Sequence, residues 1–420
     1  MRQIEWFFRK GLGAGDRHGN AVAQLLWARA LRDFGDGFIA ILLPVYLTAL
    51  GFSPFAVGVI ATASLLGSAL LTLGVGLIGA RHDHRRLLLA LASLMIASGV
   101  AMALVHDYAL ILVVAFAGTI NPSAGSASAL APLEHAVLAR AVADRRRTGT
   151  FSLYSLVGAL SGAFGGLAAA APDGLSLVGI GGIEAIKLMF VLYALLGVGG
   201  TLLYARIPPQ RPTAPQQAAA LGPSRNIVWK LAALFSLDAF AGGFVVQSLL
   251  ALWLFERFDL PLSSAAVFFF WSGVLSAFSF PVAAWLSRHI GLINTMVFTH
   301  IPASLCLILA AVAPTLPVAL ALLLIRAALS QMDVPTRSSY VMAVVTEPER
   351  AAAASFTSVP RSLAAALSPT LGGALFAASF LAGPLIICGV LKIAYDLLLL
   401  IQFRHVKPPE ERRDLTRPPA

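Results

Sequence analysis

Hydrophobic residues fall into long runs along the chain, and short polar segments separate one run from the next. A helix that crosses a bilayer needs about 20 mostly apolar residues, so each long run predicts one spanning helix. Twelve runs are long enough, and they cover residues 31–52, 55–79, 87–106, 109–131, 151–171, 185–205, 231–255, 263–286, 293–313, 316–335, 355–378 and 382–403. The pattern predicts an all-α polytopic membrane protein with twelve transmembrane helices.

Composition supports this fold class. Of 420 residues, 58% are hydrophobic and only 12% are Asp, Glu, Lys or Arg. A soluble protein of this length cannot bury so much apolar surface, which excludes a cytosolic enzyme, a disordered protein and a secreted module. Both cysteines, Cys306 and Cys388, lie in apolar runs, so neither a disulfide framework nor a cysteine-rich metal site is expected. No nucleophile–base or metal-binding pattern is present, and we predict no enzymatic activity and no cofactor.

The net charge of +10 does not point to nucleic acid, because the basic residues form short clusters between apolar runs. That distribution is typical of cytoplasmic loops. With a cytoplasmic N-terminus, most of the 30 Lys and Arg residues fall on inward-facing segments. The chain is rich in Arg and Ala, which is typical of a GC-rich bacterial genome. We therefore expect a multi-pass protein of the bacterial inner membrane, surrounded by lipid, with both termini cytoplasmic and with no cleaved leader.

The longest polar break, residues 208–225, is rich in Pro and Gln and is predicted to be a cytosolic linker. It divides the chain into a cytosolic N-terminal segment (1–23), a six-helix bundle (24–205), the linker (206–228), a second six-helix bundle (229–404) and a cytosolic tail (405–420). The halves resemble each other weakly, since Arg147 and Pro132 recur at the same spacing as Arg350 and Pro335. Two pseudo-symmetric six-helix halves are typical of transporters that work by rocking.

The loop after the second span begins with Gly76, continues through Arg81 and Asp83, and ends with Arg85 and Arg86. Together with the twelve spans and the central linker, it resembles the major facilitator superfamily, whose loop usually reads G-x-x-x-D-R-x-G-R-K. The resemblance implies that this loop helps to latch the two halves. Ala80 stands where the family has Asp, so Asp83 is the candidate substitute. Arg81, Asp83 and Arg85 are expected to act in gating.

The fifth span carries a set of small residues: Gly158, Gly162, Gly165 and Gly166. It is similar to the family's antiporter signature, g-x-x-x-G-P-x-x-G-G, although Ala163 replaces the Pro. The alternative is that these glycines serve close helix packing. Residues 331–337 also resemble bacterial members described as drug-efflux proteins.

A charge at the centre of a bilayer costs about 2.5–3.5 kcal/mol, so charged residues inside spans are expected to be functional. Charged and strongly polar residues concentrate in the first, fourth, seventh and tenth spans, which line the central cavity in the family that the chain resembles. We expect proton-coupling or substrate-binding roles for Asp36, Asn121, Asp238, Arg326 and Asp333. Arg326 could bind an anionic substrate or hold a carboxylate charged; the alternative is a fixed ion pair with Asp36 or Asp238.

Four other polar residues have structural or gating interpretations. Lys392 and Asp396 are four residues apart and are predicted to pair with each other. His300 is expected to be a core histidine. Arg361 and Glu134, near the cytosolic ends of their spans, are expected to make gate contacts.

The sequence thus favours a monomeric secondary active transporter that works by alternating access and exports a small organic compound in exchange for protons. One alternative is an uptake symporter or uniporter for a small organic anion, with Arg326 as the anion ligand. Another is a membrane structural or lipid-handling protein that has kept the fold without transport.

Overall fold

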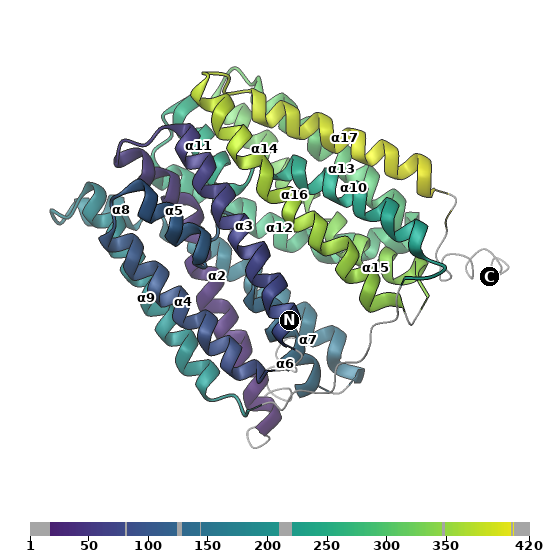
Figure 1. The fold of residues 1–420 in the computed structure, drawn as a ribbon. Coiled ribbons are helices and arrows are strands. Elements are labelled where there is room, and N and C mark those ends of the chain that lie inside the picture. Colours follow the sequence, from purple (N-terminus) through teal and green to yellow (C-terminus); the bar gives the residue numbers. More distant parts are fainter. Residues whose placement is uncertain are drawn as a thin grey trace. The chain divides into compact units, whose positions relative to one another are not determined.

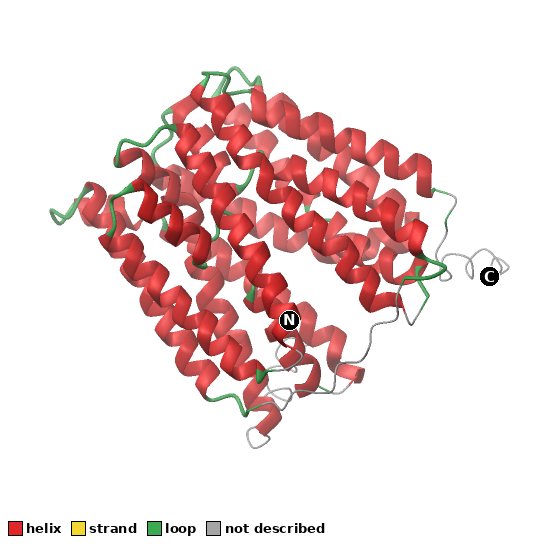
Figure 2. Cartoon of the chain, viewed as in Figure 1, coloured by secondary structure: helices red, strands yellow, loops and turns green. Residues whose placement is uncertain are grey.

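The computed structural model describes residues 17–79, 82–123, 128–142, 144–209, 221–346, 349–404 and 406. All regular secondary structure in this part of the chain is helical, as Figure 2 shows, which confirms the all-α prediction. Nine helical stretches among these residues are long and apolar enough to cross a membrane. The first, fourth and eleventh predicted spans are not among the nine, because they carry several charges or polar residues or are interrupted.

The chain divides into two compact units, one made of Met1–Leu50 and Gly67–Pro215 and the other of Gly51–Leu66 and Gln216–Ala420. Helix α3 contributes its N-terminal part to the second unit and its C-terminal part to the first. In the second unit, Thr370 on α16 donates its backbone N–H to the Thr62 hydroxyl of α3 at 3.0 Å.

In the first unit, α2 packs along α7 and α9, and α4 packs along α9. A buried apolar cluster, which includes Leu25, Leu88 and Val137, holds these helices together. Along the chain (Figure 1), the helices are α2 (Arg17–Ala49), α3 (Pro54–Gly79), α4 (His84–Leu104), α5 (Tyr108–Ala117), α6 (Leu130–Ala141), α7 (Asp144–Ala168), α8 (Ala171–Ser176) and α9 (Gly182–Ala205).

The glycines of α7 lie where this helix meets α2. A Cβ atom on Gly165 would lie 2.0 Å from the Phe34 carbonyl oxygen, and one on Gly37 would lie 2.2 Å from the Gly162 carbonyl oxygen and 2.9 Å from the Gly166 nitrogen. Only hydrogen fits at such distances, so these glycines allow two backbones to approach closely. Close helix packing therefore accounts for them physically.

In the second unit, α10 packs along α16 and α17, and α13 packs along α14 and α17. The long neighbouring ribbons of α16 and α17 are visible in Figure 1. The helices are α10 (Arg225–Gly243), α11 (Gln247–Phe258), α12 (Leu262–Ile290), α13 (Leu292–Ala311), α14 (Leu316–Ser330), α15 (Asp333–Val344), α16 (Arg350–Ala377) and α17 (Gly383–Phe403).

Three predicted spans are interrupted. The fourth stops at Ala117 and resumes at Leu130, the seventh is broken between α10 and α11, and the tenth is broken between α14 and α15. In the fourth, the Asn121 side chain accepts a hydrogen bond from the Ser123 N–H at 2.9 Å, and Pro122 has no N–H to donate. The break after Ser330 means that Arg326 and Asp333, which the sequence places in one predicted span, lie on two separate helices.

Helix α2 begins at Arg17, well before the predicted start of the first span at residue 31. In the added segment, Arg29 contacts Asp33 at 2.7 Å. This ion pair along the helix offsets the charge of Arg29, which lies before the predicted start of the apolar run.

Glu349, a buried residue just before α16, binds the C-terminal end of the linker. Its carboxylate accepts hydrogen bonds from the Ser224 hydroxyl at 2.6 Å, from the Thr346 hydroxyl at 2.5 Å and from the Gly222 N–H. These bonds, that from Ser224 foremost, lower the pKa of Glu349 to about 2. The carboxylate therefore ties the start of α10 to the segment between α15 and α16.

We expect Glu349→Gln to lower the melting temperature of the purified protein at neutral pH. Because the pKa of Glu349 is lower in the folded state, its carboxylate stabilises the folded state fully above the usual pKa of 4.5. This stabilisation is lost as the pH falls toward about 2. The difference in melting temperature between Glu349→Gln and wild type is therefore constant above about pH 5 and becomes smaller below it. Thermal unfolding in detergent at pH 7.5 and pH 4 measures it, with the exposed Glu256→Gln as the matched control. Equal melting temperatures at pH 7.5 would show that the carboxylate contributes nothing.

Candidate functional site

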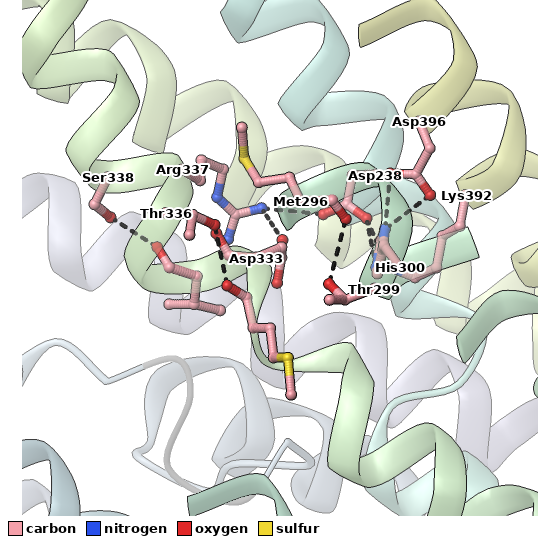
Figure 3. A network of polar contacts seen from close by, with 12 residues as sticks. Asp238, Met296, Thr299, His300, Asp333, Thr336, Arg337, Ser338, Lys392 and Asp396 are labelled. Carbon is pink, nitrogen blue, oxygen red and sulfur yellow. Dashed lines mark hydrogen bonds and ion pairs between the residues drawn. The ribbon is translucent and has the colours of Figure 1, made fainter. Parts of the chain in front are cut away.

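Six ionisable side chains converge inside the second unit (Figure 3). They come from α10, α13, α15 and α17, and we call them the Asp238 cluster: Asp238, His300, Asp333, Arg337, Lys392 and Asp396. Their side chains are at most 13% exposed. Such burial of charge is stable only when every ion has a close partner.

Asp238 is the centre of this cluster. Its Oδ1 atom accepts a 2.5 Å hydrogen bond from Lys392, and its Oδ2 atom accepts one of 3.1 Å from Arg337. Arg337 also contacts Asp333 one helical turn earlier, at 3.1 Å, and its guanidinium lies over the ring of Phe235, 5.4 Å from the centroid. Asp238 and Arg337 thus join α10 to α15, and Lys392 joins both to α17.

His300 lies between Lys392 and Asp396. Its Nδ1 atom is 3.1 Å from each oxygen of Asp396, and its Nε2 atom is 3.4 Å from Lys392 Nζ and 3.9 Å from Asp238 Oδ1. The predicted pairing of Lys392 with Asp396 is therefore wrong. Lys392 pairs with Asp238 instead, because α10 and α13 supply closer partners than the next turn of α17.

Two further arginines lie near this cluster without a counter-ion. Arg326 on α14 is half-buried and within electrostatic range of Cys388, which precedes Lys392 by one helical turn. Arg361 on α16 is within electrostatic range of Asp238 and Asp333, and its buried Nε atom has no hydrogen-bond partner. Among the described residues, neither arginine makes an ion pair.

The charges of this region do not cancel. Three buried carboxylates, those of Asp238, Asp333 and Asp396, pair with Arg337, Lys392 and His300, and Arg361 lies within electrostatic range of the first two. Arg326, near Cys388, is a further cation, so the Lys and Arg side chains of this region outnumber its carboxylates by one.

The first unit has its own buried charges, around Glu134 of α6. The carboxylate contacts Arg32 at 2.8 Å and accepts hydrogen bonds of 2.5 Å from the hydroxyls of Tyr154 and Tyr204. Arg32 also contacts Asp33, at 3.4 Å. Glu134 is completely buried. These contacts, all within one unit, join α2, α6, α7 and α9.

Asp36 lies one turn from Asp33 and is 2% exposed, but it has no cation at ion-pair distance among the residues described. Its contact is the Tyr193 hydroxyl, at 3.2 Å. That hydroxyl is also 3.1 Å from the Thr119 carbonyl oxygen. One phenolic proton cannot serve both acceptors at once, so Tyr193 offers Asp36 at most a shared hydrogen bond.

The remaining predicted residues have local roles or lie elsewhere. Asn121 is buried beside the break in the fourth span. Asp83 caps α4 by accepting a 3.0 Å hydrogen bond from the Arg85 N–H, while the buried Nε atom of Arg85 has no partner. Arg81 lies outside the described residues. Within the described ranges, no group of three or more His, Cys, Asp or Glu side chains is placed to hold a metal ion.

The sequence did not single out several of these residues as a site. Arg337 follows Asp333 by four positions, a helical spacing that could have indicated the pair. Lys392 and His300 carried no comparable signal, because their partners lie on other helices. Arg32 carried no such signal either, because its partner Glu134 lies on another helix.

Comparison with known proteins places the chain in a family. Residues 25–332, well over half of the chain, match the model of the Major Facilitator Superfamily. The chain belongs to the major facilitator superfamily. It is therefore a multi-pass membrane transporter and not an enzyme, and the predicted twelve helices are consistent with this family.

Known relatives are distant in sequence and similar in fold. The uncharacterized membrane protein YJR124C of Saccharomyces cerevisiae is 22% identical over 421 residues, which cover 91% of this chain and 94% of the yeast protein. A bacterial homologue of the human lysosomal transporter Spinster has a TM-score of 0.69 at 15% identity, over 93% of this chain and 96% of its own. The nucleoside transporter NupG has a TM-score of 0.70 at 15% identity, over 92% of this chain and 100% of its own.

We expect Asp238→Asn to destabilise this superfamily member by about 3–5 kcal/mol, because Lys392 and Arg337 lose the charge they share. Adding Lys392→Met to Asp238→Asn should restore part of the lost stability, because it removes one of the two cations that lose the Asp238 carboxylate. Thermal unfolding in detergent measures both variants. The exposed Asp259→Asn is the matched control. Wild-type stability of Asp238→Asn would mean that the ion pairs contribute little.

Proposed function

We propose that this protein is a proton-coupled transporter of a small organic anion, with Arg326 and Arg361 as anion ligands and Asp36 as a proton-carrying group. The observation that carries the proposal is the excess of Lys and Arg side chains over carboxylates around the Asp238 cluster of the second unit. It favours the organic anion over an uncharged or cationic compound. Alternating access remains the proposed mechanism.

Two arginines without counter-ions support anion binding. A guanidinium inside a bilayer costs about 2.5–3.5 kcal/mol, and the structure gives Arg326 and Arg361 no carboxylate in the described residues to offset this cost. A guanidinium presents a planar set of donors that matches a carboxylate or phosphate in a bidentate geometry. An anionic substrate would supply the missing partner.

Asp36 supports proton coupling. A carboxyl group without a cationic partner can bind or release a proton as its access to water changes. The other carboxylates of the first unit's cluster, Asp33 and Glu134, are held by arginines, so they are poorly suited to this exchange. Asp36 is the carboxyl group best suited to carry the proton.

We favour cotransport of the anion and the proton in one direction over exchange. The expectation of efflux rested on the glycines of the fifth span and on the resemblance to drug-efflux members, and close packing of α7 against α2 accounts for those glycines without antiport. The clusters of basic residues support a bacterial inner membrane as the setting, with both termini cytoplasmic. We also propose that the transporter acts as a monomer.

Arg326→Gln should lower the affinity for an organic anion by about 10- to 100-fold, because one charge-assisted hydrogen-bonding group is lost. Uptake of lactate, succinate and benzoate into proteoliposomes under an imposed proton gradient measures this. Arg288→Gln, an exposed arginine at the end of α12, is the matched control. No uptake of any of the three by wild type, or unchanged uptake by Arg326→Gln, would contradict the proposed anion site.

Asp36→Asn should abolish accumulation driven by the proton gradient but preserve exchange of labelled for unlabelled anion. The amide keeps the size of the side chain but cannot carry a proton. Accumulation and exchange in the same proteoliposomes separate the two effects, with Asp107→Asn as a control at the start of α5. Gradient-driven accumulation by Asp36→Asn would assign the proton to another group.

A further inference from the structure

A surface pocket lies in the first unit, where the C-terminal end of α4 meets the N-terminal part of α9. Its volume is about 480 Å³, within the range that holds small-molecule ligands. The two helices run side by side (Figure 1), and a Cβ atom on Gly99 of α4 would lie 2.8 Å from the Phe190 carbonyl oxygen of α9. One helical turn after Gly99, Ala103 and Leu104 line the pocket. The pocket therefore adjoins a close contact between two backbones.

Buried contacts of Tyr46 on α2 set the positions of both helices beside the pocket. The Tyr46 hydroxyl lies 3.1 Å from the carbonyl oxygens of Met102 and Val105, at the end of α4. Its ring packs edge-on against that of Phe190, with the centroids 5.0 Å apart. Tyr46 is fully buried. The pocket is therefore formed by helices that the rest of the unit holds in place.

The pocket combines one ion pair with apolar side chains. Lys187 Nζ contacts Glu184 Oε1 at 2.7 Å, and both residues line the pocket. Leu104, Leu188 and Val191 also line it and are 71%, 45% and 42% exposed. Large apolar side chains that stay exposed together are typical of a surface that contacts lipid or another apolar partner. A matching ligand carries charges of both signs next to a hydrocarbon part.

The pocket lies at the ends of α4 and α9 that are remote from the basic residues. Arg86 stands at the start of α4, and Arg206 directly follows α9. The loops at the other ends, residues 105–107 and 177–181, carry no Lys or Arg. Basic residues favour the cytoplasmic side, so with the proposed cytoplasmic termini the pocket belongs to the outer side of the membrane.

We propose that this pocket binds a zwitterionic phospholipid whose headgroup carries a primary ammonium, as phosphatidylethanolamine does. The phosphate accepts hydrogen bonds from Lys187, the headgroup ammonium donates to Glu184, and an acyl chain lies against Leu188 and Val191. An ammonium has three N–H donors and a carboxylate has two accepting oxygens, so Lys187 and Glu184 can each bind the lipid while they remain in contact. This inference goes beyond the proposed transport and does not depend on the transported compound.

The charge of the pocket selects between phospholipids. An anionic headgroup without an ammonium, as in phosphatidylglycerol, would bind Lys187 but place its charge beside the Glu184 carboxylate with nothing to donate to it. A surrounding membrane that contains both lipids would therefore supply the zwitterionic one to this pocket.

The test is lipid binding by the full-length protein in detergent, measured by native mass spectrometry, which resolves each bound lipid by its mass. Wild type should bind the first phosphatidylethanolamine about tenfold more tightly than the first phosphatidylglycerol. Glu184→Gln should lose this preference, because the amide no longer attracts the ammonium or repels the anionic headgroup. Asp173→Asn, an exposed carboxylate of α8, is the matched control and should keep it. Equal affinities of wild type for the two lipids, or an unchanged preference in Glu184→Gln, would overturn the proposal.

A second variant fills the pocket without changing any charge. Val191→Trp should weaken binding of the first phosphatidylethanolamine by about tenfold. Leu195→Trp should not, because Leu195 is exposed one turn further along α9 and does not line the pocket. Unchanged binding by Val191→Trp would place the lipid elsewhere. Displacement of the lipid by water-soluble glycerophosphoethanolamine would show that the headgroup alone is recognised and would overturn the assignment to a lipid.

Discussion

A charge surrounded by apolar helices must find its partner inside the protein, because lipid offers none. Asp238 meets this constraint by binding Lys392 and Arg337 at once, and Glu134 meets it by binding Arg32 and two tyrosine hydroxyls. Each contact joins helices that are far apart in the sequence. The buried ion pairs therefore fix the neighbours of α10 and α6 more specifically than apolar contacts can.

The same constraint makes the unsatisfied groups informative. Among the described residues, the carboxylate of Asp36 in the first unit and the guanidiniums of Arg326 and Arg361 in the second unit make no ion pair. A group that is costly to bury and has no permanent partner is suited to a transient one. A proton suits the carboxylate and an organic anion suits the guanidiniums, so the two units provide complementary chemistry.

His300 shows how one polar side chain can connect helices through a buried cluster. Its ring joins Asp396 to Lys392, so it contributes to the packing of α13 against α17. The sequence predicted a core histidine, and the residue is 2% exposed. The sequence did not indicate its partners, because Asp396 and Lys392 lie on another helix.

Hydrophobic runs, basic loops and composition determined by themselves that this is an all-α polytopic membrane protein, because helix length and lipid exposure are encoded locally. The loop that resembles the major facilitator superfamily added the family. The hydrophobic runs also indicated Asp36, Asp238 and Arg326 as unusual, because a charged residue within an apolar run can be recognised from the sequence. Only the tertiary structure decided which of these charges are paired. Lys392 and Asp238 are 154 residues apart, and helical spacing within α17 wrongly assigned Lys392 to Asp396. The interruptions after Gly243 and Ser330 lie inside runs that were predicted as single spans, although glycines stand at the first break and the polar Gln331 and Asp333 at the second. Local patterns describe what a helix contains, whereas the partner of a buried charge depends on which helices pack together.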